Sequence, residues 1–577
     1  MRRIATVFVI LLIITLVAGS CSGTATTTRS GKTGGAFIEG SYGGDGETLN
    51  LLLAADATSH SYIGHTIDSL ATYDNQLSLV LRCLARDVDV SPDGLVYTVA
   101  IRDDLKWSDG SQVTAEDYVY TIKNLMQSDW LNYPYKGDWE ENIEGKETGI
   151  IPDVVNKTTF TITRKTVDPE FNYTIYDLIP YPKNIALKYE GNVDAFTRAP
   201  EFNNLTYTGN LGPYKFVEWI RNDRFVVQRN PDYYLGKDNG APYFEKYIVK
   251  LFGTSATMEA AMESGDITMC GIQPDKASKF KSNPKVNVYT IPSGGYNLIG
   301  YNQRPNGWGG LKKAAVRQAL SMAISKEAIT QRIYMGFAEP AYSFIPVTSP
   351  WYDADSVVKY GVGNLFNKQK AAQMLYEAGY GIKKADGGYQ AAGKDGNPLK
   401  LTLLTSTGGG IAENIAFFVK QELADIGIQV DLKQVPWETM VRKYLMSKVP
   451  GKEQEPRWNN GPDAVSDEAW DLVLMGFSTD IKAPSGSEIF FISDGGLNFM
   501  GYTNLKVDEL FKRVKSKEAL DISARKELYA EISKLLSDEQ PVDFLIFGRG
   551  NVAFQKNVKG VDPGISMGYN YYLWYFE

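Results

Sequence analysis

Two hydrophobic periods alternate along this chain, and together they predict a fold that mixes strands with helices. The clearest example begins at residues 91–94 (SPDG), which predict a turn. Apolar residues at every second position of 95–101 then predict a strand. After a second predicted turn, residues 114–117 (TAED) form a capping box that starts a helix over 117–125. The alternation continues to the end of the chain without a fixed repeat length.

Three further segments keep a 3.6-residue apolar spacing, which predicts helices that pack one face against a sheet. They cover residues 316–324, 371–378 and 415–426. Residues 428–432 follow the last of them and predict a strand, as in a strand–helix–strand unit. Residues 450–468 contain three Pro, two Gly and many charges, so they predict a surface insertion rather than part of a core.

The N-terminus predicts export. Two Arg residues precede an apolar stretch at 4–17, and the small residues 18–20 lead to Cys21. The stretch is too short to span a bilayer, so residues 1–20 are interpreted as a signal peptide. Cys21 resembles the lipidated cysteine of a bacterial lipobox, although Ala18 stands where Leu is usual. Residues 21–35 are then the lipid-anchor Cys and a flexible tether. An ordinary cleaved signal with an incidental Cys is the alternative.

The overall charge limits the possible partners. The chain carries a formal net charge of −8, and loss of the two Arg residues with the signal makes the mature protein more acidic. An acidic surface argues against binding to nucleic acid and against adhesion to anionic lipid. Aromatic residues make up 12% of the chain, which suits a concave surface with stacking contacts.

Cysteine and histidine are too few for common metal sites. Besides Cys21, the chain has only Cys83 and Cys270, which lie in apolar surroundings and are expected to be buried thiols rather than a disulfide. Its two His residues, His60 and His65, are five apart and do not share a helix face. We therefore expect no metal and no cofactor.

A search for catalytic patterns favours a binding protein over an enzyme. The chain has no GxSxG, HExxH or CxxC motif, and both His residues lie near the N-terminus. Carboxylates are abundant, so a glycosidase pair stays open as an alternative.

Several sequence blocks resemble one known family in order and spacing. They include residues 91–98, 106–110 with 114–117, 212–216 with 229–234, and 315–320. Through these blocks the chain is similar to the family 5 extracellular solute-binding proteins, the oligopeptide- and dipeptide-binding components of ABC importers. The similarity extends from about residue 45 to the end.

The resemblance implies an α/β protein with a bilobal, periplasmic-binding-protein-like fold of class II. Its three domains would surround a cleft that closes by a hinge. The implied domain I comprises 36–75, 205–298 and 543–577, domain II 76–204, and domain III 299–542 with the insertion at about 450–468. Strands near 294–302 and 543–550 would join the two lobes.

The resemblance also implies ligand-binding residues. Asp480 matches the Asp that holds the free α-amino group of a peptide, in residues 476–484 (GFSTDIKAP). Phe477 and Trp437 match aromatic residues of the cleft, and Gly295, Tyr296 and Asn297 would offer backbone groups to the ligand. The alternative interpretations are a turn Asp at a strand end and ordinary core aromatics.

The function implied is a substrate-binding receptor of an ABC importer, which captures peptides between two lobes and delivers them to permease subunits. An oligosaccharide receptor is the alternative, and a nickel-complex receptor is weakened by the shortage of His. The protein is expected to be a monomer that is exported and lipid-anchored at the outer face of the cell membrane, or periplasmic.

Overall fold

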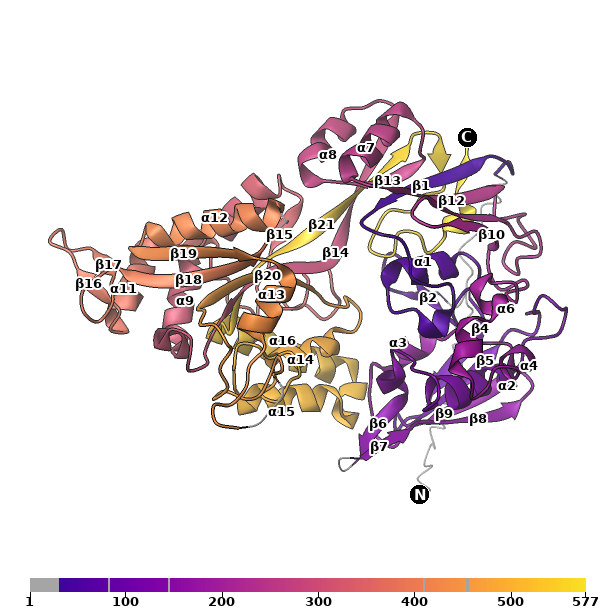
Figure 1. The fold of residues 1–577 in the computed structure, drawn as a ribbon, viewed down its shortest axis with the longest axis horizontal. Helices are drawn as coiled ribbons and strands as arrows, with labels where there is room; N and C mark the ends of the chain where they lie inside the picture. Colours follow the sequence, from indigo (N-terminus) through magenta and orange to yellow (C-terminus); the bar gives the residue numbers. More distant parts are fainter. Residues whose placement is uncertain (1–30, 81–82, 144–145, 408–409, 453–455) are drawn as a thin grey trace, which may run out of the picture.

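The computed structural model describes residues 31–80, 83–143, 146–407, 410–452 and 456–577. The predicted signal peptide, Cys21 and most of the predicted tether lie outside these residues. The chain forms two lobes that are joined by the long strands β14 (Val286–Tyr301) and β21 (Val542–Gln555), as Figure 1 shows. The first lobe holds β1–β13, α1–α8 and the C-terminal strands. The second lobe holds β15–β20 and α9–α16.

Within the described residues, the largest sheet has eleven strands and runs through both lobes. Its strands, in spatial order, are β10 (Tyr214–Ile220), β11 (Arg224–Arg229), β12 (Lys246–Phe252), β1 (Ala36–Tyr42), β13 (Met269–Ile272), β21, β14, β20 (Leu472–Ser478), β18 (Leu399–Ser406) and β19 (Ile428–Val435), with β15 (Ala338–Pro340) paired to β21.

The two lobe-joining strands change partners halfway along their length. The first half of β21 pairs with the second half of β14, and β14 there also pairs with β20 in the second lobe. The other halves pair in the first lobe, where β13 lies on the far side of β21. The β14–β21 register shifts between Pro292 and Tyr296, which places an irregularity at the crossing point. The sheet is therefore continuous across a kink.

The first lobe contains a second, four-stranded antiparallel sheet formed by β4 (Ala85–Val90), β5 (Val96–Ile101), β9 (Thr159–Thr163) and β8 (Ile151–Asn156). Tyr97, Val99 and Ile101 of β5 are buried, so the alternation predicted for this strand is confirmed. The shorter strands are β2 (Thr72–Tyr73), β3 (Leu79–Val80), β6 (Glu140–Ile143), β7 (Lys146–Gly149), β22 (Val558–Lys559) and β23 (Tyr575–Phe576).

Helices of the first lobe are short. They are α1 (Ala57–Gly64), α2 (Ala115–Tyr120), α3 (Phe171–Tyr176), α4 (Lys183–Ala186), α5 (Val193–Thr197), α6 (Pro200–Asn203), α7 (Ser255–Ser264) and α8 (Pro274–Lys281). The predicted capping box begins α2, because the Asp117 carboxylate accepts a hydrogen bond from the Thr114 backbone N–H at 2.9 Å. This helix continues as a π-helical turn over Thr121–Met126, so the helical segment begins two residues earlier than predicted.

The helices of the second lobe range from three to eighteen residues in length. They are α9 (Ala314–Met322), α10 (Lys326–Ala328), α11 (Lys368–Glu377), α12 (Gly410–Ala424), α13 (Trp437–Met440), α14 (Glu488–Phe491), α15 (Leu505–Val514) and α16 (Ile522–Glu539), with the hairpin strands β16 (Gly381–Lys383) and β17 (Tyr389–Ala391). The three helices predicted from apolar spacing are present as α9, α11 and α12. β18, α12 and β19 form the predicted strand–helix–strand unit, and its strands are parallel.

Separate hydrophobic cores fill the two lobes. One large cluster of buried side chains holds the first lobe together around Phe37, Tyr118 and Phe196. Two clusters lie on opposite faces of the second-lobe sheet, because successive side chains of a strand point to opposite sides. Ile299 belongs to one cluster and Leu298 to the other. With a core on each side of the kink, each lobe is built to keep its own shape.

Two further predictions concern the cysteines and the segment 450–468. Cys83 and Cys270 are buried and are not joined to each other, which confirms the expectation of buried thiols. Residues 450–452 and 456–468 are mostly exposed, but Ala464 is buried and Trp458 packs against a core cluster. The buried guanidinium of Arg304 donates to the Trp458 carbonyl at 2.7 Å and so fastens this surface segment to the lobe.

Candidate functional site

A cavity of about 670 Å³ lies between the two lobes. Its first-lobe wall comes from the segment around α1, from residues 133–139 and from residues 168–179 around α3. The second-lobe wall comes from Asp480, Ala483, Ser485 and Gly486, in the segment after β20. A volume of this size is typical of small-ligand sites. Because both lobes supply its walls, relative motion of the lobes would open or close it.

Carboxylates dominate the polar lining of this cavity. Asp138, Asp168, Glu170 and Asp177 come from the first lobe and Asp480 from the second, and the lining includes no Lys or Arg among the described residues. Burial raises the pKa of Asp138 and of Asp177 above the ordinary range. For Asp177, the negative charge of Asp480 adds to this rise and the nearby Lys482 opposes it. A cavity with this lining favours a positively charged group.

Asp480 closes a turn and also lines the interlobe cavity. Its Oδ1 accepts hydrogen bonds from the backbone N–H groups of Lys482 at 2.7 Å and Ala483 at 3.4 Å, which forms an Asx turn after β20. The side chain is exposed and also lines the cavity. Its Oδ2 accepts no hydrogen bond from the described residues, so the turn engages only one of the two carboxylate oxygens.

A second cavity, of about 370 Å³, lies at the crossing of β14, β20 and β21. Gly295, Tyr296, Asn297 and Phe477 all line it, so the structure brings four of the predicted residues together. The Tyr334 hydroxyl donates to Asn297 Oδ1 at 2.6 Å and orients that amide.

Glycines leave the main chain accessible in this second cavity. Gly295, Gly476, Gly548 and Gly550 line it together with Arg549. A glycine carries no Cβ, so backbone N–H and C=O groups can be approached closely there. All four glycines also take part in strand pairs of the large sheet.

The two predicted aromatic residues lie in different surroundings. Phe477 is half-buried, and its ring lies against Phe490 with centroids 4.3 Å apart. Trp437 is 47% exposed at the start of α13, and its ring centroid is 6.4 Å from that of Trp458. Trp437 is not among the residues that line either cavity. Its role in ligand binding remains a prediction.

The acidic residues of the first-lobe wall were not predicted from the sequence. Glu170 and Asp177 flank α3, outside the sequence blocks that carry the family resemblance. No local pattern distinguishes their carboxylates from ordinary surface acids. They belong to the cavity only because the second lobe packs opposite α3.

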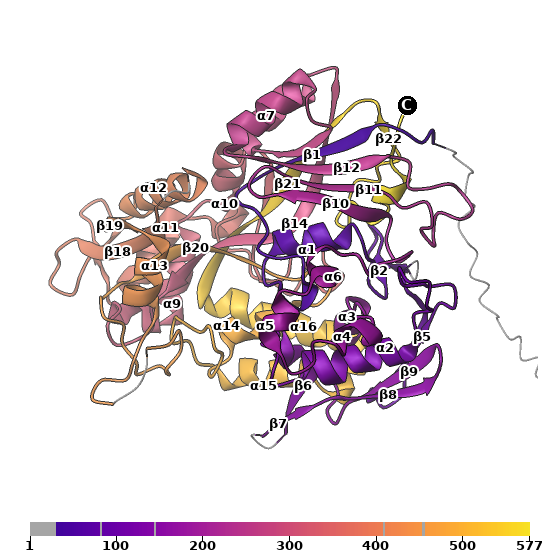
Figure 2. The ribbon, with the colours of Figure 1, turned by 45° about the vertical axis from the view of Figure 1, so that its right-hand side comes forward.

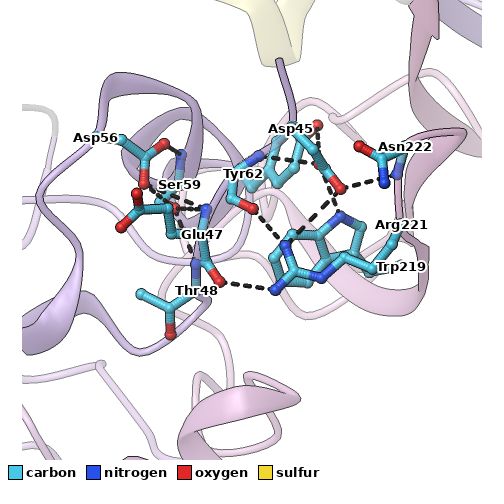
Figure 3. Close-up of polar contacts among 10 residues, drawn as sticks. Asp45, Glu47, Thr48, Asp56, Ser59, Tyr62, Trp219, Arg221 and Asn222 are labelled. Atoms are coloured by element: carbon cyan, nitrogen blue, oxygen red, sulfur yellow. Dashed lines mark hydrogen bonds and ion pairs between the residues drawn. The ribbon is translucent and has the colours of Figure 1, made fainter.

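A polar cluster around Asp45 fastens the first-lobe segment that leads into the cavity wall (Figure 3). Asp45 accepts from the Tyr62 hydroxyl at 3.1 Å, from Trp219 Nε1 at 3.0 Å and from the Asn222 backbone N–H at 2.9 Å. The Arg221 guanidinium stacks over the Trp219 ring at 3.6 Å and donates to the Glu47 carbonyl at 2.7 Å.

The other end of this segment is held by the cap of α1. Ser59 Oγ accepts from the backbone N–H groups of Glu47 and Thr48, and Ser59 donates to Asp56 at 2.5 Å. Leu51 and His60, which line the cavity, lie on the segment held between these contacts. The wall is thus fixed to the lobe before any ligand arrives.

The histidines do not form a metal centre. His60 Nε2 lies 3.2 Å from the Ala54 carbonyl oxygen, and His65 is buried among aromatic rings. Burial lowers the pKa of His65 to about 4, so its imidazole is neutral near neutral pH. Among the residues that the structure describes, no group of three or more His, Cys, Asp or Glu side chains is arranged to hold a metal ion.

Comparison with known proteins decides the family. Residues 80–498 match the sequence model of the bacterial extracellular solute-binding proteins, family 5, which covers well over half of the chain. The chain belongs to this family. Family 5 proteins are solute-binding receptors that act outside the cytoplasm, and the resemblance seen in the sequence blocks is confirmed.

Relatives in family 5 match this chain over most of its length. The oligopeptide-binding protein AppA of Bacillus subtilis is 28% identical over 571 residues, which cover 96% of this chain and 94% of the relative. The periplasmic oligopeptide-binding protein OppA of Haemophilus influenzae is 23% identical and covers 86% of each chain.

Solved structures of the family share the fold. The structure of Bacillus subtilis AppA in complex with a nonapeptide has a TM-score of 0.68 and 26% identity, with 95% of this chain and all of that chain covered. The substrate-binding protein CtaP of Listeria monocytogenes has a TM-score of 0.76 at 24% identity and covers 94% of this chain and all of its own. The α/β bilobal fold expected from the sequence is confirmed. Within the described ranges, no helix has the length and apolar character needed to cross a membrane.

Proposed function

We propose that this protein is the substrate-binding receptor of an ABC importer, and that it captures peptides between its lobes and delivers them to a membrane permease. The observation that carries this proposal is the acidic interlobe cavity beside a glycine-lined crossing of three strands. The full-length similarity to AppA, whose solved structure holds a nonapeptide, supports the same conclusion.

The two cavities suit the two features that all peptides share. Every unmodified peptide has an α-ammonium group, which Asp480 would accept in a charge-assisted hydrogen bond that contributes about 1.5–3 kcal/mol. Every peptide also has a main chain, which pairs by strand addition with accessible backbone groups. Recognition of this kind holds many sequences, because side chains are left in roomy and hydrated pockets.

The hinge of this receptor would lie where β14 and β21 cross between the lobes. Domain I of 36–75, 205–298 and 543–577 would carry the inserted domain II of 76–204, and domain III of 299–542 would move against them. The register shift at Pro292–Tyr296 supports this assignment, because an irregular strand absorbs backbone rotation more easily than a regular ladder.

The receptor would act without chemical change to its ligand, as a monomer tethered to the membrane. Lipidation of Cys21 would hold it at the outer face of the cell membrane, and the tether of 21–35 would raise its effective concentration at the permease. Palmitate labelling of the expressed full chain tests the anchor. The Cys21→Ala variant should lose the label, and an unlabelled wild type would remove the anchor from the proposal.

Ligands retained by the purified protein test the central claim. Mass spectrometry of the released small molecules should find peptides. Thermal-shift panels of peptides and of oligosaccharides should then give stabilisation with peptides. Stabilisation by sugars alone would establish the oligosaccharide alternative, for which the aromatic lining of Tyr133, Tyr135 and Trp139 offers stacking surfaces.

A further inference from the structure

The two lobes touch at a second place, far along the chain from the crossing strands. Figure 1 and Figure 2 both place α15 and α16 of the second lobe beside the first-lobe region of α3, β6 and β7. At the centre of this contact lies Glu170, which immediately precedes α3 and is only 7% exposed.

The Glu170 carboxylate accepts its hydrogen bonds from the opposite lobe. Ser485 donates through its hydroxyl at 2.5 Å and through its backbone N–H at 3.3 Å to Oε2. The buried hydroxyl of Tyr529, on α16, donates to Oε1. Among the described residues, no first-lobe group donates to this carboxylate.

Neighbouring contacts reinforce the same boundary. The buried guanidinium of Arg525 donates to the Pro169 carbonyl at 3.4 Å, so a positive charge lies close to Glu170. The Arg525 guanidinium is held from its own lobe by the Ala519 carbonyl at 2.7 Å and by the Trp351 ring beneath it. Leu520 of the second lobe packs closely on Gly94 of the first lobe. A Cβ added at Gly94 would lie 2.9 Å from the methyl groups of Leu520.

The position of the Glu170 carboxylate makes the free energy of lobe closure depend on this contact. A buried charge is costly unless hydrogen bonds satisfy it, and the partners that satisfy Glu170 are present only when the lobes meet. Opening the cleft would break three hydrogen bonds and return the carboxylate to water. Removing one donor would leave the charge buried with fewer partners, so the closed arrangement alone would lose stability.

We propose that Glu170 forms an interlobe latch with Ser485 and Tyr529, and that this latch holds part of the ligand-free population closed. Glu170 and Ser485 also line the interlobe cavity, so the latch lies at the edge of the ligand space. The latch depends on contacts between the lobes and not on the identity of the ligand.

Two tyrosines of the second lobe provide a matched test. Tyr529 and Tyr502 are both buried, and each donates its hydroxyl to a Glu carboxylate. The partner of Tyr502 is Glu539 in the same lobe, at 2.9 Å, whereas the partner of Tyr529 lies across the lobe boundary. Tyr529→Phe and Tyr502→Phe therefore remove equivalent hydrogen bonds, of which only one joins the lobes.

Small-angle X-ray scattering of the ligand-free mature protein measures the outcome. Tyr529→Phe should have a larger radius of gyration than the wild type, because a larger fraction of its molecules is open. We expect the closed-to-open population ratio to fall about tenfold, which is the factor expected for loss of a charge-assisted hydrogen bond. Tyr502→Phe should scatter as the wild type does. Ser485→Ala, a change in the short 3-10 helix Pro484–Ser487, should open the protein in the same direction by a smaller factor, because the Ser485 backbone N–H can still donate.

Equal radii of gyration for the wild type and for Tyr529→Phe and Ser485→Ala would overturn the latch. Circular dichroism spectra that match the wild type establish that each variant is folded before its scattering is compared. Since no ligand enters these measurements, they stand or fall independently of the peptide assignment.

Discussion

Asp480 satisfies the local backbone and faces the ligand space at the same time. One oxygen closes the turn after β20, and the side chain lines the interlobe cavity with Asp177 on the opposite wall. The two interpretations of this residue are therefore compatible, because the turn fixes the direction in which the carboxylate points. A positioned carboxylate binds an ammonium group at a lower entropic cost than a mobile one.

We predict that N-acetylated peptides bind at least tenfold more weakly than the same peptides with a free amine, because the ion pair with Asp480 is lost. In Asp480→Asn the two forms should bind equally. Isothermal titration of both peptides against both proteins measures this. The exposed surface residue Asp463 provides the control, since Asp463→Asn should keep the preference for the free amine. Equal affinities in the wild type would contradict the assignment.

His65 is a second residue whose behaviour follows from its surroundings. It is buried, and its ring centroid lies 4.3 Å from that of Tyr247. Neither ring nitrogen has a hydrogen-bond partner among the residues that the structure describes. Burial lowers its pKa to about 4 from an ordinary value of 6.5. Below pH 6.5 the unfolded chain binds a proton at this position and the folded protein does not, so stability is lost as the pH falls from 6.5 to about 4.

The loss from His65 amounts to about 3 kcal/mol across that window. His65→Phe should remove this part of the pH dependence, because a phenyl ring fills the aromatic pocket and binds no proton. Melting temperatures at several pH values between neutral and pH 4 measure the effect. An unchanged profile in His65→Phe would show that other groups cause the acid loss.

At the scale of elements, the crossing of β14 and β20 depends on one close approach. A Cβ at Gly294 would lie 2.2 Å from the Thr479 carbonyl oxygen, whereas a Cβ at the adjacent Gly295 would meet only the Ser293 hydroxyl at 3.3 Å. The Gly294 carbonyl also accepts from the Thr479 backbone N–H at 3.0 Å. Glycine at 294 thus lets two strands meet where the sheet passes between the lobes.

We predict that Gly294→Ala lowers the melting temperature by several degrees and weakens ligand binding, because the clash pushes β20 and the Asp480 turn away from β14. Gly295→Ala should have a much smaller effect on the melting temperature, because its Cβ would meet only the Ser293 hydroxyl. Differential scanning calorimetry and peptide titration of the two variants provide the comparison. A Gly294→Ala protein with wild-type stability would show that the strands separate at little cost.

At the scale of the whole molecule, charge should influence how ligands arrive. The chain has a formal net charge of −8, and the cavity lining adds a local concentration of carboxylates. Potentials of this sign attract cations over distances near the Debye length, about 10 Å at 0.1 M salt. Ligand association is therefore expected to depend on the sign of the ligand charge.

We predict that a lysine-containing peptide associates faster than a glutamate-containing peptide of equal length, and that the difference shrinks as salt is added. Stopped-flow fluorescence at low and high salt measures the two association rates. A neutral peptide provides the reference, because its rate should change little with salt. Rates that are independent of both ligand charge and salt would contradict electrostatic guidance by the cleft.

The features that could be predicted from the sequence are those that depend on residues close together in the chain. The capping box at Thr114 and Asp117, the alternation in β5 and the apolar faces of α9, α11 and α12 were all predictable, because each depends on residues a few positions apart. The family was also apparent from the local blocks of sequence. The exact start of α2 was not, because helix ends respond to neighbouring elements as well as to their own residues.

The amino-acid sequence by itself determined the mixture of strands and helices, the family and the N-terminal export pattern, since these are written in residues that lie close together. Only the tertiary structure decided which residues share the cleft. Glu170 meets Ser485 from 315 positions away, and Asp177 faces Asp480, because β14 and β21 carry the chain between the lobes. Such contacts depend on the path of the whole chain, and no local pattern of charge or hydrophobicity records that path.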